Sequence, residues 1–227
     1  MSDIFKNTTK KSLRNYFLSE KNTVYLLISM YLAGIIGLRW EFSREIFKFL
    51  VPFNLIFTTF VVLFFHRDWN KYFVFFIIFT FLVGFFVEVL GVETGKIFGK
   101  YHYQTTLGIK IMQVPPIIGL NWLVLVYAVG VFCASFDVKI LQNKILQIAL
   151  GASVMTFLDF LIEPVAIKYT FWVWDEPAIP LQNYVAWWFI SCFLLLIFRY
   201  LPFAKNNRIA IVVLLLQFLF FLVLNLI

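Results

Sequence analysis

Few carboxylic side chains lie in or beside the long apolar runs on the face of the expected bundle that carries its two long loops, and they are the residues best suited to chemistry. They are Glu88, Glu93, Asp159 and Glu163. An isolated charge at the centre of a bilayer costs roughly 2.5–3.5 kcal/mol even on the lenient insertion scale, so such groups face a cavity or a partner. Asp159 and Glu163 are four residues apart and share one face of a helix. Two carboxylates in a poorly hydrated place resist double ionisation, so we expect one of them to keep a proton for acid catalysis.

Aromatic side chains follow two of these carboxylates at equal distances. Tyr101 and Tyr103 come 13 and 15 residues after Glu88, and the same separations lead from Asp159 to a second pair, Trp172 and Trp174. Each pair is followed by proline and then by a further tryptophan, Trp122 or Trp187. The spacing indicates a parallel repeat of two helix–loop–helix units, with a site between the halves.

His102, between the two tyrosines, and Asn183, before the last of these tryptophans, join the candidate set. Structural interpretations stand beside the functional ones. Glu88 and Asp159 could accept hydrogen bonds from indole groups, and Glu93 could be a solvated loop residue. His102 could anchor the chain at the interface, and Asn183 could cap a helix rather than position water.

The residues that are absent narrow the chemistry. Two histidines cannot build a multi-histidine iron site, no Cys/His cluster has metal-ligand spacing, and no glycine-rich nucleotide motif follows a strand. We therefore expect a site without metal or cofactor, in which acid and base groups work in an aromatic pocket. One reaction that suits such a site is the addition of water to a trisubstituted isoprenoid double bond. Its first step, protonation of the double bond, gives a tertiary cation, which aromatic faces stabilise by about 2 kcal/mol or more when desolvated. Water then captures that cation.

Composition determines the elements that must position these residues. The chain has 227 residues, of which 62% are hydrophobic, 21% aromatic and 14% charged. A soluble domain has about 45–50% apolar and about 25% charged residues, so this composition predicts an all-α, polytopic membrane bundle. Seven runs are long enough to be candidate spans: Val24–Leu38, Ile46–Phe65, Tyr72–Leu90, Ile117–Phe136, Ile145–Ile162, Tyr184–Phe198 and Ile209–Ile227.

The charged segments predict the domain plan and the orientation. A basic polar tail, 1–23, precedes a single membrane domain, 24–227, and the positive-inside rule favours an N-terminus in the cytoplasm. The net charge of +7 fits this topology signal rather than nucleic-acid binding. Two long aromatic connections, 91–116 and 163–183, fall on the same face and are expected to be interfacial or re-entrant loops.

The motif-bearing core, 88–189, resembles a known membrane family. The pattern E-x-x-G-x-x-T-G-x-x-F-G-x-Y-x-Y starts at Glu88, and D-x-x-x-E-P starts at Asp159. V-P-x-x-I…W opens the fourth span, and W-x-W…I-P-x-Q-N-Y…W runs from Trp172. These segments are similar to the carotenoid biosynthesis membrane family, which includes the carotenoid 1,2-hydratases and haloarchaeal bisanhydrobacterioruberin hydratase.

The resemblance implies a hydro-lyase that adds water to the acyclic end group of a carotenoid. Within it we assign proton donation to Asp159 with Glu163 as its coupled partner, and water orientation to Glu88. The expected substrate-binding residues are Tyr101, His102, Tyr103, Trp172, Trp174, Asn183, Trp187 and Glu93.

Two alternatives remain open at this point: a cyclase that begins with the same protonation, and a non-catalytic carotenoid-binding subunit or transporter. The expected location is a prokaryotic cytoplasmic membrane. The expected partners are the lipid-soluble carotenoid, membrane lipid and other carotenoid biosynthesis enzymes.

Overall fold

The chain forms seven long helices and one two-stranded sheet in the computed structural model, which describes residues 19–136 and 143–227. The helices are α2 (Glu20–Arg39), α3 (Glu41–Phe64), α4 (Lys71–Thr94), α5 (Ile117–Ala134), α6 (Lys144–Lys168), α7 (Leu181–Tyr200) and α8 (Arg208–Leu226). The strands are β1 (Tyr101–Tyr103) and β2 (Trp172–Trp174). All seven helices are long and apolar enough to cross a membrane, which confirms the predicted bundle. Most of the expected basic tail lies outside the described residues, and α2 begins at Glu20.

Local side chains explain where several helices begin. Asn70 accepts hydrogen bonds from the first backbone amides of α4, and Asn143 does the same for α6. Such caps satisfy amides that have no partner inside the helix. Pro116 and Pro180 instead precede α5 and α7, where a missing N–H costs nothing. The two helices that follow the long connections therefore start in the same way.

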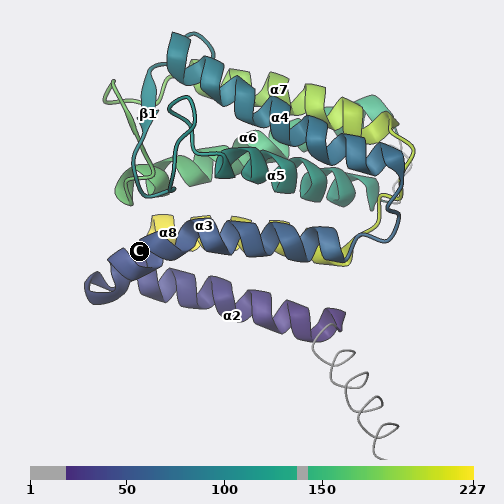
Figure 1. Cartoon of the computed structure of the whole chain (residues 1–227), viewed down its shortest axis with the longest axis horizontal. Coiled ribbons are helices and arrows are strands. Elements are labelled where there is room, and N and C mark those ends of the chain that lie inside the picture. The colour runs from purple at the N-terminus through teal and green to yellow at the C-terminus, as the bar shows by residue number, and fades with distance from the viewer. Residues whose placement is uncertain (1–18, 137–142) are drawn as a thin grey trace, which may run out of the picture.

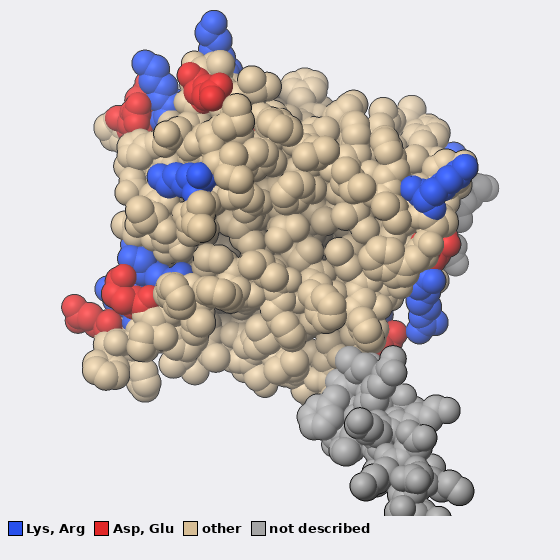
Figure 2. All heavy atoms as spheres, in the orientation of Figure 1, with Lys and Arg blue, Asp and Glu red and all other residues tan. Residues whose placement is uncertain are grey.

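The helices lie side by side along the long axis of the molecule (Figure 1). In that view α4 and α7 form one side and α2 the other, with α5, α6, α3 and α8 between them. Helix α5 is the centre of the bundle, because it packs against α3, α4, α6, α7 and α8. Charged side chains gather at the two ends, and uncharged ones cover the band between them (Figure 2). This distribution suits a bundle that stands across a bilayer.

The two long connections meet at one end of the bundle, as expected for loops on the same face (Figure 1). Strands β1 and β2 pair antiparallel, with Tyr101 opposite Trp174, His102 opposite Val173 and Tyr103 opposite Trp172. We call this two-stranded sheet the clasp. It was not predicted, because strands of three residues give too short a pattern to recognise.

Candidate active site

Three buried carboxyl groups meet in one cavity beneath the clasp. Glu88 is 4% exposed, Asp159 1% and Glu163 2%. The cavity measures about 30 Å³ and lies between α4, α5, α6, α7 and the clasp. Its walls are formed by Glu88, Phe98, Tyr101, Tyr103, Ile118, Asn121, Trp122, Asp159, Glu163, Trp172, Trp174, Asn183 and Trp187. We refer to it as the acidic cavity.

Glu88 accepts three hydrogen bonds, and they use both of its oxygens. The hydroxyls of Tyr101 and Tyr103 donate to Oε2 at 2.5 and 2.8 Å, and the indole of Trp122 donates to Oε1 at 2.9 Å. Burial raises the pKa of both tyrosines well above the usual value, and the negative charge of Glu88 adds to this. Both phenols therefore keep their protons and act as donors. Glu88 thus ties β1 and α5 to α4.

Glu163 plays the corresponding part for the second strand. The indoles of Trp172 and Trp174 both donate to its Oε2, at 3.0 and 2.8 Å. From the equal separations in the sequence, Asp159 was expected to correspond to Glu88. The hydrogen bonds show that Glu163 corresponds to Glu88, because each of these two glutamates accepts from the two aromatic side chains of one strand. That register of the repeat was wrong by one helical turn. The loop after α6 is shorter than the loop after α4, so the later carboxylate reaches the strand.

Asp159 is the carboxyl group that does not anchor a strand. Its Oδ2 accepts a hydrogen bond of 2.8 Å from Nδ2 of Asn183, which is itself only 2% exposed. In the described part of the chain no hydrogen bond reaches Asp159 Oδ1 or Glu163 Oε1, although both residues line the acidic cavity. These two oxygens are therefore available to a bound molecule.

Two tryptophans, from α5 and α7, stack against each other in the cavity wall. The rings of Trp122 and Trp187 lie 4.1 Å apart, inclined by 17°. Gly84 of α4 makes room for this arrangement, because a Cβ at that position would lie 2.4 Å from the Cβ of Trp122. Close packing of α4 against α5 thus fixes the tryptophan that also holds Glu88.

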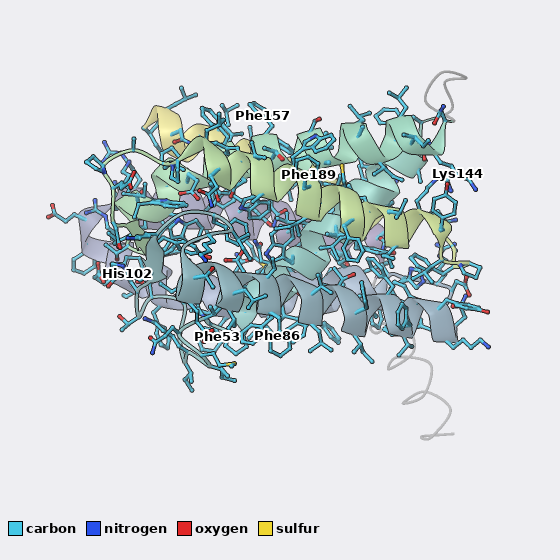
Figure 3. All side chains as sticks on the ribbon, turned by 90° about the horizontal axis from the view of Figure 1, so that it is seen from above. Phe53, Phe86, His102, Lys144, Phe157 and Phe189 are labelled. Atoms are coloured by element: carbon cyan, nitrogen blue, oxygen red, sulfur yellow. The ribbon has the colours of Figure 1, made fainter. Side chains whose placement is uncertain are left out.

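Nearly all of the expected site residues line the acidic cavity, but His102 and Glu93 do not. Successive residues of a strand point to opposite sides, so His102 faces away where Tyr101 and Tyr103 face inward. Its side chain is 56% exposed, and Nδ1 lies 3.3 Å from Oδ1 of Asp175 (Figure 3). Glu93 is exposed on the last turn of α4. Five residues after Glu88, it lies on another face of the helix.

Four residues of the wall were not among the expected site residues: Phe98, Ile118, Asn121 and Trp122, the last of which was noted only as part of the repeat. Nothing marks Phe98 or Ile118 among so many apolar residues. Asn121 had a recognisable signal, since it is a polar residue near the start of an apolar span. Its side chain makes no hydrogen bond within residues 19–136 and 143–227, so its amide is open to the cavity.

The chemistry of this arrangement follows from its parts. Carboxyl oxygens without protein partners face a small space walled by indole and phenol rings, so a proton can be delivered there to an apolar molecule. Aromatic faces next to that position stabilise positive charge. Within the described residues no group of three or more His, Cys, Asp or Glu side chains could hold a metal ion.

Comparison with known proteins adds two similarities. A family model described as carotenoid biosynthesis protein matches residues 49–227. A bisanhydrobacterioruberin hydratase from Haloarcula japonica is 28% identical over 113 residues, which cover 44% of this chain and 36% of that protein. The chain thus spans little more than a third of the length of this relative. No solved structure matches the chain.

Proposed function

The chain belongs to the carotenoid biosynthesis protein family, and we propose that it is a hydratase that adds water to the terminal trisubstituted double bond of an acyclic carotenoid. The observation that carries this proposal is Asp159, a buried carboxyl group with one oxygen held by Asn183 and the other facing the acidic cavity. The similarity to a protein named as a hydratase supports the same proposal.

Proton transfer from Asp159 starts the proposed reaction. The O–H bond of its carboxyl group breaks as a C–H bond forms at the less substituted carbon of the double bond, leaving a tertiary cation. Water attacks this cation through its oxygen and loses a proton to the carboxylate pair. Asp159 and Glu163 lie one helical turn apart, so they are suited to share one proton. The pair ends the cycle with the proton that it started with.

The aromatic wall stabilises the cation. Trp172 and Trp174 lie close to the carboxyl pair, because they donate to Glu163, and the stacked Trp122 and Trp187 lie across the same space. A desolvated ring face contributes about 2 kcal/mol or more to the stability of a cation. In this proposal Glu88 positions Tyr101, Tyr103 and Trp122 rather than the attacking water, since both of its oxygens are already bonded.

The attacking water fits the acidic cavity itself. A volume of about 30 Å³ exceeds the minimum for one water molecule. Asn121 offers a free amide at the edge of this space, so we assign it the task of holding that water. A carotenoid end group is much larger than the cavity, and it must approach from a neighbouring space.

The test is expression of the chain in a bacterial host that accumulates lycopene, with the pigments identified by mass. We expect products heavier by one or two waters, and we expect the Asp159→Asn variant to lose them. General acid catalysis contributes about 10²–10⁴-fold to a reaction rate, so the variant should form at most about one hundredth of the product that wild type forms. A second host that makes desaturated or elongated acyclic carotenoids covers a different substrate of the same class.

Other outcomes identify the competing functions. A product of unchanged mass with shifted absorption would establish cyclisation. Altered pigment content without any new product, equal in wild type and Asp159→Asn, would establish a non-catalytic binding protein and refute the hydratase.

A further inference from the structure

Two more cavities lie between α2, α3, α5 and α8, and the inner one borders the acidic cavity at Asn121. The inner one measures about 120 Å³ and reaches from Tyr31 and Thr58 to Phe171 and Asn121. The outer one measures about 350 Å³ and is almost wholly apolar, with walls from α2, α3 and Phe220 of α8. Both are larger than the acidic cavity, and both consist mainly of aliphatic and aromatic side chains.

The three cavities form a series. Leu38, Val51, Asn54 and Phe220 line both the outer and the inner cavity. Asn121 lines both the inner cavity and the acidic cavity. A side chain with surface in two cavities lies between them, so the order from the outside inward is the outer cavity, Val51, the inner cavity, Asn121 and then the acidic cavity with its carboxyl groups.

The outer cavity opens on the apolar belt of the molecule. Ala33 is exposed there, Leu50 is 42% exposed and Phe53 is 54% exposed, and all three line this cavity. Phe53 lies at the outer edge of the bundle (Figure 3), and none of the described residues that line this cavity is charged. The opening therefore faces lipid acyl chains rather than water.

The inner cavity contains polar groups in the middle of membrane helices. Thr58 donates to Oδ1 of Asn54 at 3.0 Å, and Tyr31 is hydrogen bonded to Thr58. Gln217 is only 7% exposed, and among the described residues its Oε1 has no hydrogen-bond partner. An unpaired amide oxygen in such a place is costly, and it marks a position for a molecule with an O–H donor. Water entering the reaction and the alcohol formed by it both supply this donor.

We propose that these cavities form a lateral channel, through which one end of a linear polyene passes from the lipid between α2 and α3 to the acidic cavity. This inference rests on the proposed function for the identity of the reacting end. A linear hydrocarbon suits the channel because its walls are apolar and its mouth faces acyl chains. The rest of the polyene stays in the outer cavity and the surrounding lipid.

The test measures occupancy of the channel separately from catalysis. Protein carrying Asp159→Asn is purified in mild detergent from the lycopene-accumulating host, and bound pigment per protein is read from the visible absorption. The substitution Val51→Trp fills the junction between the outer and inner cavities, and Ala33→Trp fills the mouth. Their matched controls are Ile56→Trp and Ile36→Trp, on the same helices at exposed positions that line none of the three cavities.

We expect each channel substitution to lower bound pigment by roughly tenfold or more, since overpacking a filled site is strongly unfavourable. Both controls should keep it within about twofold. Ala33 lies at the surface, so a tryptophan there leaves the fold intact even if Val51→Trp disturbs it. Folding is verified by elution volume and thermal unfolding. Pigment retained by folded Ala33→Trp protein at the level of its control would overturn the channel.

The same variants without Asp159→Asn separate the two proposals. If wild type adds water and Ala33→Trp adds it at the control rate, the channel is wrong and the hydratase stands. If pigment binding depends on Ala33 and Val51 but wild type adds no water to any acyclic carotenoid, the channel stands and the hydratase is wrong.

Discussion

Single residues in the acidic cavity differ in how many of their carboxyl oxygens are already bonded. Glu88 uses both oxygens, whereas Glu163 accepts both of its indole donors at Oε2 alone. Asp159 uses one oxygen, toward Asn183. An amide side chain has one accepting oxygen and one donating nitrogen. The same change to an amide therefore has different consequences at these positions.

We predict that Glu163→Gln keeps the stability of the protein but lowers its activity. The amide oxygen can still accept from both tryptophans, while the shared proton is lost. Glu88→Gln instead turns the new NH₂ group toward a donor, and leaving a buried donor unsatisfied costs about 1–3 kcal/mol. Thermal unfolding in detergent together with product mass would distinguish the two variants.

Glu93→Gln is the control for both, because it removes an exposed carboxylate from α4 without touching the cavity. It should match wild type in unfolding temperature and in product. If Glu163→Gln were as unstable as Glu88→Gln, the arrangement in which both indoles donate to one oxygen of Glu163 would be wrong.

Carboxylic residues inside apolar runs could be identified as site residues from the sequence alone, and Glu88, Asp159 and Glu163 are examples. Their partners could not be assigned, since the length of each connection decides which carboxylate a strand reaches. His102 could have been placed outside the site if the three-residue strand had been recognised, because its neighbours both point inward.

Elements pack so closely around the cavity that one methyl group is expected to disturb it. We predict that Gly84→Ala displaces Trp122, weakens its hydrogen bond to Glu88 and separates it from Trp187. Misplacement by about 1 Å can cost 10²-fold in rate. The near-UV circular dichroism of the stacked indoles should fall together with product formation.

Leu82→Ala is the comparison for this variant, since Leu82 lies on the exposed side of the same helix. It should leave both signals unchanged. A Gly84→Ala protein with wild-type dichroism and activity would contradict the packing argument.

All seven spans were predicted to within a few residues at nearly every end, because long apolar runs dominate the signal. The largest deviation is in α6, which was expected to end at Ile162 but continues through Pro164 to Lys168. A proline normally ends a helix, but here the surrounding helices support the turn beyond it. That extra length positions Glu163 inside the bundle.

The whole molecule has a second polar cluster at the end opposite the clasp. His66 is 3% exposed, contacts the hydroxyl of Tyr127 at 2.7 Å and the carbonyl of Asp68 at 2.8 Å, and stacks on Phe73. Burial lowers the pKa of His66 below 6.5. Unfolding therefore takes up a proton, and this residue destabilises the fold as the pH falls below about 6.5.

We predict that wild-type protein loses stability between pH 7.5 and pH 5.5 relative to a His66→Gln variant, by up to about 1.4 kcal/mol for each unit of pKa shift. Burial also lowers the pKa of Lys205, to about 8, and because both proteins contain this lysine, its titration does not contribute to the difference between them. Thermal unfolding at the two pH values provides the comparison. His102→Gln, at an exposed histidine, should retain the wild-type dependence.

Orientation across the membrane is a further prediction for the whole chain. Seven spans with a cytoplasmic N-terminus put the C-terminus, the clasp and the acidic cavity toward the outer face. An alkaline phosphatase fused to the C-terminus should be active, and a green fluorescent protein at the same position should stay dark. The reverse pattern would invert the assignment without altering the cavity.

The clasp also has a consequence for biosynthesis. The indole donors of Glu163 follow it by 9 and 11 residues, and the amide donor of Asp159 follows by 24. A nascent chain that has inserted only its first five helices therefore carries two acids in the membrane, Asp159 and Glu163, whose partners have not yet left the ribosome. A chain released by the ribosome directly after α6 would lack all three of these donors.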